Sequence, residues 1–300
     1  MLARYAGAYY NIVKIIPLTI MERKYYMGKR FEELEFKDDF MFGVIMRNPK
    51  YCKPFLETIL GIKISHIEYP KSQETIDLSS DAKSVRLDIY VEDGKGTVYN
   101  IEMQTTGNKG LPKRMRYYQG MIDLNILEKG SSYKNLKKSF VIFVCTFDLF
   151  GKGLHVYTFE NRCVQDLELP LGDDTTKIIL NTKGTKDDVS QEMKRLLDFI
   201  DGQKPEDDFT RELAEAVQSV RDNEKWRLDY MTLQMSYQEK FEQGVEQGVE
   251  QGIGQEKIEA AIRMIEAGKL SVDEIAIYSG LPLEQVLELQ KELQPVQGLL

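Results

Sequence analysis

Residues 84–104 read SVRLDIYVEDGKGTVYNIEMQ, and this stretch decides the fold. Apolar and polar side chains alternate through residues 84–92 with a period of two, which is typical of a β-strand. Asp93-Gly94-Lys95-Gly96 predicts a hairpin turn, and residues 98–104 alternate in the same way. A three-residue turn at 94–96 predicts a register in which Asp88 lies opposite Glu102. The chain therefore contains a β-hairpin with two carboxylates facing each other on its polar face.

These opposed carboxylates have a chemical consequence. Directly opposed side chains have Cβ atoms about 5 Å apart, so Asp88 and Glu102 repel each other unless positive charge lies between them. A divalent cation would provide that charge, and oxygen-only ligands favour Mg²⁺ or Mn²⁺ over zinc. Gln104 lies on the same face, two residues further along. The alternative from spacing alone is that both carboxylates belong to the solvent-exposed face of an edge hairpin.

The segments around the hairpin predict a mixed α/β fold. Residues 37–61 indicate two short helices separated at Asn48-Pro49, and residues 112–129 indicate a basic helix. Eight apolar or small residues without alternation at 140–147 predict a central strand buried on both faces. The remaining elements are expected as strands at 62–69, 155–159 and 177–180 and a helix at 187–200. This order places helices on both faces of a mixed sheet.

The character of the chain changes after Pro205. Residues 207–241 predict one long acidic helix, and residues 242–253 repeat a period of four as EQGV, EQGV and EQGI. Each interior glycine costs a helix about 1 kcal/mol relative to alanine, so the repeat is expected to be a marginal helix or a flexible hinge, and its composition is that of a linker. Two helical patterns in 255–293 resemble a helix-turn-helix, but glutamates on the second would repel a phosphate backbone. We expect this tail to bind a partner or a second copy of the chain rather than DNA.

These boundaries predict the domain organisation. The segments are an N-terminal extension at 1–30, an α/β core at 31–205, a helical extension at 206–241, the glycine-containing EQG linker at 242–254 and a helical tail at 255–300. Polar residues interrupt the apolar stretches of residues 1–20, so no membrane span is expected and the protein is expected in the cytoplasm. A charged stretch opens at Met21, which leaves open that translation begins there.

Composition excludes several classes of protein. Three widely spaced cysteines and two histidines provide neither a disulfide framework nor a zinc ligand set. The sequence lacks a serine or cysteine nucleophile constellation and the glycine-rich phosphate loop of an NTPase. The net charge of −8 is uneven, because residues 201–300 carry −11 and residues 1–200 carry +3. Eight cations against two carboxylates in 105–140 form a patch able to face phosphates, and a solvated helix surface would show the same charge.

Several stretches together resemble a known family. They are KDDFMFGVIMRNP at 37–49, VRLDIYVED at 85–93, IEMQTT at 101–106, the run 111–163 that begins LPKRMRYYQG, and the EQG repeats. Over about residues 31–255 this set resembles the PD-(D/E)xK nuclease family transposases, the recombination-promoting nuclease or putative transposase group. The resemblance implies a restriction-endonuclease-like α/β core with an acidic helical tail. It also implies a Mg²⁺-dependent DNA endonuclease linked to recombination, mobile elements or defence.

The resemblance also implies site residues. Asp88 and Glu102 match the acidic metal-binding pair, and Gln104 matches the third motif position, where many nucleases of the superfamily have lysine. An amide can orient a water molecule but cannot supply a cation, so that role is expected to fall to the metal or to Arg116. Asp39 matches an acidic residue of the N-terminal helix, with a supporting role near the site or a helix-capping role.

The basic helix and the C-terminal region are expected to bind partners. Lys113, Arg114 and Arg116 are expected to neutralise DNA phosphates, and Gln119 to face the site. Self-association is expected through an amphipathic pattern within 212–237, because two sites in a symmetric oligomer would help to cut both strands. Its apolar members are Leu213, Val217, Val220, Leu228, Met231 and Met235. The alternatives are that this stripe packs on the chain's own core, and that the chain is an RNase or a catalytically weak nucleic-acid-binding or oligomeric protein.

Overall fold

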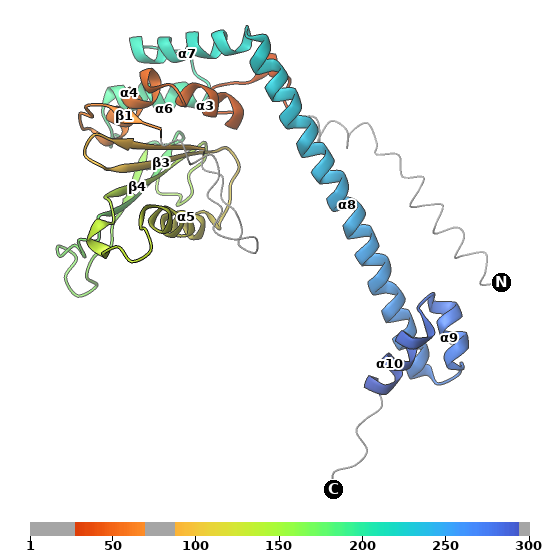
Figure 1. Cartoon of the computed structure of the whole chain (residues 1–300). Coiled ribbons are helices and arrows are strands. Elements are labelled where there is room, and N and C mark those ends of the chain that lie inside the picture. Colours follow the sequence, from red (N-terminus) through yellow and green to blue (C-terminus); the bar gives the residue numbers. More distant parts are fainter. Residues whose placement is uncertain (1–27, 70–87, 294–300) are drawn as a thin grey trace. The chain divides into compact units, whose positions relative to one another are not determined.

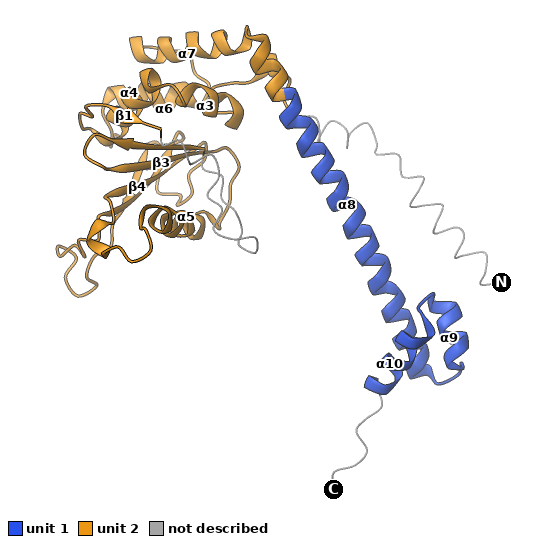
Figure 2. Ribbon diagram, in the orientation of Figure 1, with its two compact units in different colours: residues 1–28, 231–300 blue, residues 29–230 orange. Residues whose placement is uncertain are grey.

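The computed structural model describes residues 28–69 and 88–293. These residues form two compact units, one of residues 29–230 and one whose described part is residue 28 and residues 231–293 (Figure 2). Residues 1–27, which make up most of the expected N-terminal extension, lie outside the described residues, as does the predicted strand segment 84–87. No helix among the described residues is long and apolar enough to cross a membrane.

The first unit is built on a six-stranded mixed sheet with the order β1-β2-β3-β4-β6-β5. β2 and β3 form the antiparallel hairpin, whereas β3, β4 and β6 run parallel to one another. The strands are β1 (Ile67–Glu68), β2 (Ile89–Asp93), β3 (Val98–Gln104), β4 (Ser139–Cys145), β5 (Val156–Phe159) and β6 (Thr175–Asn181). The mixed α/β fold expected from the sequence is therefore confirmed.

The hairpin register is the one that the turn predicts. Ile89 pairs with Ile101 and Tyr90 pairs with Asn100, which carries Asp88 to the position opposite Glu102. The alternative of a solvent-exposed edge hairpin is wrong, because β4 pairs with the free side of β3 and every residue of β3 is buried. β4 is central and buried, as its unbroken apolar sequence predicts.

Helices cover both faces of the sheet (Figure 1). On one face, α3 (Asp39–Met46), α4 (Pro49–Leu60), α6 (Gln191–Ile200) and α7 (Asp208–Arg221) enclose the larger core with β3, β4 and β6. On the other face, α5 (Leu111–Ile126) packs against Val141 and Phe143 of β4. The break between α3 and α4 occurs where Asn48-Pro49 predicts it, since the Asn48 side chain accepts a hydrogen bond from the Lys50 N–H. Short 3₁₀ turns, η1 (Phe31–Glu33) and η2 (Tyr133–Asn135), complete the unit.

The C-terminal region differs from the prediction of one helix over 207–241. α7 ends at Arg221, and α8 (Glu224–Ala267) begins after Asn223, whose side-chain oxygen accepts hydrogen bonds from the Lys225 and Trp226 N–H groups. Such a cap starts a new helix. α8 continues through residues 242–254, so the expected linker is helical. The glycine penalty there is spread among good helix formers and does not end the helix.

The tail forms a small helical cluster, and the amphipathic stripe is buried on α7 but exposed on α8. α9 (Val272–Ser279) and α10 (Leu283–Leu293) pack with the end of α8 around Ala261, Ile275 and Val286, which confirms the two helical patterns. In the stripe, the α7 members Leu213, Val217 and Val220 are buried in the core of the first unit. The α8 members Leu228, Met231 and Met235 are more than half exposed. The alternative of packing on the chain's own core is therefore correct for α7 alone.

The segment after β6 packs closely against the buried His155, and a substitution can test this contact. His155 is 1% exposed, and its Nδ1 lies 2.7 Å from Asp188 Oδ1. A Cβ atom added at Gly184 would lie 2.4 Å from the His155 ring, which is too close for any carbon atom. We therefore expect Gly184→Ala to lower the free energy of unfolding by about 1–3 kcal/mol through overpacking. The measurement is urea unfolding followed by the fluorescence of Trp226, the single tryptophan.

Gly120→Ala is the matched control. A Cβ atom at Gly120 in α5 meets no atom within 4 Å, so alanine there is expected to stabilise the helix by up to about 1 kcal/mol. Equal unfolding midpoints for the two variants would contradict the packing of His155 against Gly184.

Candidate active site

Two carboxylates meet where β2 pairs with β3. Asp88, the residue before β2, donates its backbone N–H to Glu102 Oε1 at 3.1 Å. The Asp88 carboxylate in turn accepts a hydrogen bond from the Met103 N–H at 3.2 Å. Glu102 is 1% exposed, whereas Asp88 is partly exposed. The backbone of the hairpin thus holds both predicted acidic residues in one place.

The electrostatics of this pair are unfavourable for two negative charges. Burial raises the pKa of Glu102 well above its usual value, and the nearby charge of Asp88 raises it further. The Asp88 N–H and the Arg114 guanidinium oppose this shift and lower the pKa. The net shift is upward, so the attraction from these donors does not fully offset desolvation and repulsion. Additional positive charge at this point would stabilise the ionised pair.

The cation beside the carboxylates is Arg114, which α5 directs toward the end of β3. One guanidinium nitrogen, NH2, donates to Glu102 Oε2 at 3.0 Å, and NH1 donates to Gln104 Oε1 at 2.9 Å. Nε donates to the Tyr118 hydroxyl at 3.0 Å, and the guanidinium carbon lies 4.8 Å from the centre of the Phe143 ring. This planar fork matches the fixed donor geometry of arginine, which a lysine could not reproduce.

Of the three cations expected to contact phosphates from the basic helix, Arg114 is instead paired with Glu102. Lys113 and Arg116 are exposed on α5, whereas only a third of the Arg114 side chain is exposed. Arg116 lies two residues from Arg114, and residues two apart do not share a face of a helix. The structure thus places Arg114, not Arg116, where a cation can act on the carboxylate pair.

Gln104 is fixed at both ends of its amide. Its Nε2 donates to the Thr106 carbonyl at 2.7 Å and to the Thr106 hydroxyl at 3.1 Å, while Oε1 accepts from Arg114. Sequence reasoning gave this amide the task of orienting a water molecule. In the structure it orients the Arg114 guanidinium.

Asp39 and Gln119 have different positions relative to the pair. Asp39 is the first residue of α3; burial and Asp38 raise its pKa, and Arg114 lowers it, so Asp39 lies within electrostatic reach of Arg114. The N-cap of α3 is Asp38, not Asp39. Gln119 Nε2 donates to Asp123 and to Ser139 at the start of β4, the end of that strand remote from Gln104. Gln119 therefore does not face the carboxylate pair.

The partners of Arg114 were missed at the sequence level. Tyr118 follows Arg114 by four residues, a spacing that brings side chains together on one helix face, and this was the available signal. Phe143 carries no comparable signal, because only the packing of α5 on β4 brings its ring under the guanidinium.

The donor chemistry fits a hard divalent cation. Asp88 and Glu102 offer only oxygen ligands, and their repulsion is the condition that a cation relieves. Among residues 28–69 and 88–293, no group of three or more histidine, cysteine, aspartate and glutamate side chains is arranged to hold a metal. Mg²⁺ nevertheless binds through one or two carboxylates while it keeps several water ligands. The pair is therefore suited to Mg²⁺ or Mn²⁺ rather than to a closed structural site.

Comparison with known proteins gives one match. A family model described as PD-(D/E)XK nuclease family transposase matches residues 32–200, a range that contains every residue of the site. No curated protein and no solved structure matches the chain.

The raised pKa of Glu102 predicts the pH dependence of metal binding. Protons compete with a metal for this carboxylate, so metal affinity is expected to increase as pH rises through the folded-state pKa. Mg²⁺ should therefore raise the melting temperature of the chain more at about pH 9 than at about pH 6. Thermal unfolding with and without Mg²⁺ at both pH values measures this.

Two variants test whether the Mg²⁺-dependent rise in melting temperature comes from the carboxylate pair. Asp88→Asn is expected to lose the Mg²⁺-dependent rise in melting temperature. Glu92→Gln removes a carboxylate from the same strand, where Glu92 pairs with Lys137, and is expected to keep the rise. A rise that is equal in all three proteins would show that Mg²⁺ acts elsewhere.

Proposed function

Because the chain belongs to the PD-(D/E)XK nuclease family transposases, we propose that it is a metal-dependent DNA endonuclease that acts in the cytoplasm in recombination, mobile-element spread or defence. The observation that carries this proposal is the pairing of Asp88 with the buried Glu102, which the backbone of the hairpin holds and the Arg114 guanidinium faces. The reaction is hydrolysis of a phosphodiester bond.

In this proposal Asp88 and Glu102 hold the metal, which is Mg²⁺ or Mn²⁺. When bound, the ion supplies Lewis-acid activation of water and charge neutralisation at the scissile phosphate. Asp88 is positioned by the Met103 N–H, and Glu102 by the Asp88 N–H. Both carboxylates are thus oriented by main-chain groups that have little freedom to move, which favours a preorganised site.

Arg114 takes the electrostatic role that lysine has at the third motif position of many related nucleases. Its guanidinium already lies within hydrogen-bond distance of Glu102 and Gln104, so it is placed to stabilise negative charge that develops on the phosphate. Gln104 is a positioning residue for Arg114. Lys113 and Arg116, exposed on the same helix, contact flanking phosphates.

Plasmid nicking tests the proposal. With supercoiled plasmid and MgCl₂, Asp88→Asn is expected to abolish nicking, because the metal loses one of its carboxylate ligands. Arg114→Gln is expected to reduce the rate by about 10²-fold, the effect typical of losing one transition-state donor. EDTA should stop the parent reaction, and Glu92→Gln should nick at the parent rate.

Melting temperatures of the same preparations establish that each variant is folded. Full nicking by a folded Asp88→Asn protein would contradict the assignment of the metal ligands. Cleavage of RNA with no cleavage of plasmid would replace the proposal with an RNase. Metal-independent binding without cleavage of either would favour a catalytically weak nucleic-acid-binding protein.

We also propose that the chain is a homo-oligomer that associates through α8. Leu228, Met231 and Met235 are 53–63% exposed on this helix, and burying them against a second copy would remove apolar surface from water. Two nuclease units in one assembly would serve the two strands of a duplex.

Light scattering tests this association. The parent is expected to have at least twice the chain mass of 34.7 kDa, and Met231→Glu with Met235→Glu is expected to return it to one chain mass. Gln247→Glu with Gln251→Glu adds the same charge to exposed positions on α8 and should leave the mass unchanged. A parent with the mass of one chain would overturn the proposal.

A further inference from the structure

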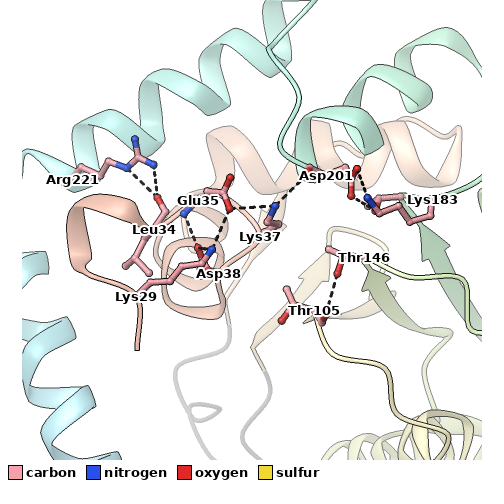
Figure 3. A network of polar contacts seen from close by, with 11 residues as sticks. Lys29, Leu34, Glu35, Lys37, Asp38, Thr105, Thr146, Lys183, Asp201 and Arg221 are labelled. Carbon is pink, nitrogen blue, oxygen red and sulfur yellow. Dashed lines mark hydrogen bonds and ion pairs between the residues drawn. The ribbon is translucent and has the colours of Figure 1, made fainter. Parts of the chain in front are cut away.

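A second cluster of polar side chains surrounds a cavity of about 310 Å³ at the carboxyl ends of β3, β4 and β6. Three lysines, Lys29, Lys37 and Lys183, line it together with the hydroxyl residues Thr105 and Thr146. Figure 3 shows the lysines and their carboxylate partners converging from the segment before α3, from the end of α6 and from the end of β6. None of these residues belongs to the site described above.

The cavity adjoins the candidate active site through the register of the sheet. Gln104 pairs with Cys145, which pairs with Asn181, so one row of residues crosses the ends of the three parallel strands. Thr105 and Thr146 directly follow this row, and the Thr146 hydroxyl donates to the Thr105 carbonyl. Thr105 lines the cavity together with Lys37, which precedes α3, and Asp201, which follows α6. The cavity therefore lies beside the carboxylate pair, on the side of the sheet covered by α3 and α6.

Carboxylates and a carbonyl hold the three ammonium groups in place. Lys29 Nζ donates to Glu35 at 3.1 Å and to Asp38 at 2.9 Å. Lys37 Nζ lies 3.2 Å from Glu35 and donates to the Asp201 carbonyl at 3.2 Å, and Lys183 Nζ donates to the Asp201 carboxylate at 2.7 Å.

These contacts leave donor capacity for a ligand. An ammonium group has three N–H donors, and the described partners use two on Lys29, two on Lys37 and one on Lys183. Each lysine therefore keeps at least one donor. The carboxylates of Glu35, Asp38 and Asp201 balance the charges of the three lysines, so what the cavity offers a ligand is these remaining N–H donors.

The ion pairs of these three lysines contribute little to the stability of the fold. The three lysine side chains are 23–56% exposed, and ion pairs with that much contact with water contribute little to folding. Their partners do restrict the rotamers of long side chains before any ligand arrives. Such preorganisation lowers the entropic cost of binding an anion.

We propose that Lys29, Lys37 and Lys183, with the hydroxyl of Thr105, form a phosphate cradle that binds the sugar-phosphate backbone of the DNA substrate beside the scissile bond. This inference rests on the proposed nuclease function and adds the position of the substrate. The backbone crosses the carboxyl end of β3, with Lys113 and Arg116 of α5 on one side and the cradle on the other. A phosphodiester contributes the acceptor oxygens that the remaining N–H and O–H groups require.

The salt dependence of DNA binding tests the cradle. Binding of the full chain to a fluorescein-labelled DNA duplex is measured in EDTA, which stops hydrolysis, over a range of NaCl concentrations. Losing two phosphate contacts through Lys29→Gln with Lys183→Gln is expected to flatten the log–log slope by about 1.8, at about 0.9 for each contact. Lys63→Gln with Lys95→Gln is the matched control, since both lysines are exposed near the opposite end of β3. The control is expected to keep the parent slope.

Further arms of the experiment separate the outcomes. Lys183→Arg retains the charge and should retain the slope, while Lys113→Gln with Arg116→Gln measures the contribution of α5. Suppose that the unmutated protein binds and cuts DNA and that the folded Lys29→Gln/Lys183→Gln variant keeps the same salt slope. This result would overturn the cradle and leave the nuclease proposal standing. A parent that neither binds nor cuts DNA would overturn both. Equal flattening in the Lys63→Gln/Lys95→Gln control would show that net charge, not the cradle, governs binding.

Discussion

The buried carboxylate of Glu102 is the constraint on which the site depends. Removing an ionised group from water costs several kcal/mol unless charges and hydrogen bonds replace the lost hydration. The Asp88 N–H and the Arg114 guanidinium supply part of this replacement, and the pKa of Glu102 remains raised despite them. The register of the hairpin and the packing of α5 are therefore both requirements of the same carboxylate. A site that is incompletely neutralised by its own chain is suited to bind a cation.

The fold places this carboxylate at the edge of the sheet where ligands can approach. β3, β4 and β6 are parallel, so their carboxyl ends open on one side of the first unit. Ligands of α/β sheets commonly bind at this edge, because the chain leaves the strands there and side chains from separate loops converge. Here the convergence includes Arg114 from α5, Asp39 from α3 and the lysines before α3 and after β6. The pocket lined by Lys63, Asp93 and Lys95 lies at the other end of β3, away from Glu102 and Gln104.

The C-terminal region shows how one amphipathic pattern can serve two purposes. The apolar residues of α7 close the core of the first unit, where they pack with α3 and α6. The same pattern continues into α8, where its members Leu228, Met231 and Met235 are exposed. The boundary falls at Asp222 and Asn223: Asp222 is the C-cap of α7, and the Asn223 side chain caps the start of α8. Residues 201–300 carry an excess of negative charge, which makes this region poorly suited to a phosphate backbone.

The sequence by itself determined the local features of this protein. The period-two alternation and the short turn determined the register that opposes Asp88 and Glu102, since both depend on residues close together in the chain. Asn48-Pro49 likewise determined the break between α3 and α4. The tertiary structure decided that β3 is buried, because β4 joins it from some 35 residues away and hairpin patterning carries no information about that neighbour. It also decided that Arg114 rather than Arg116 faces the carboxylates, because the rotation of α5 about its axis is set by packing Leu111 and Met115 against the sheet.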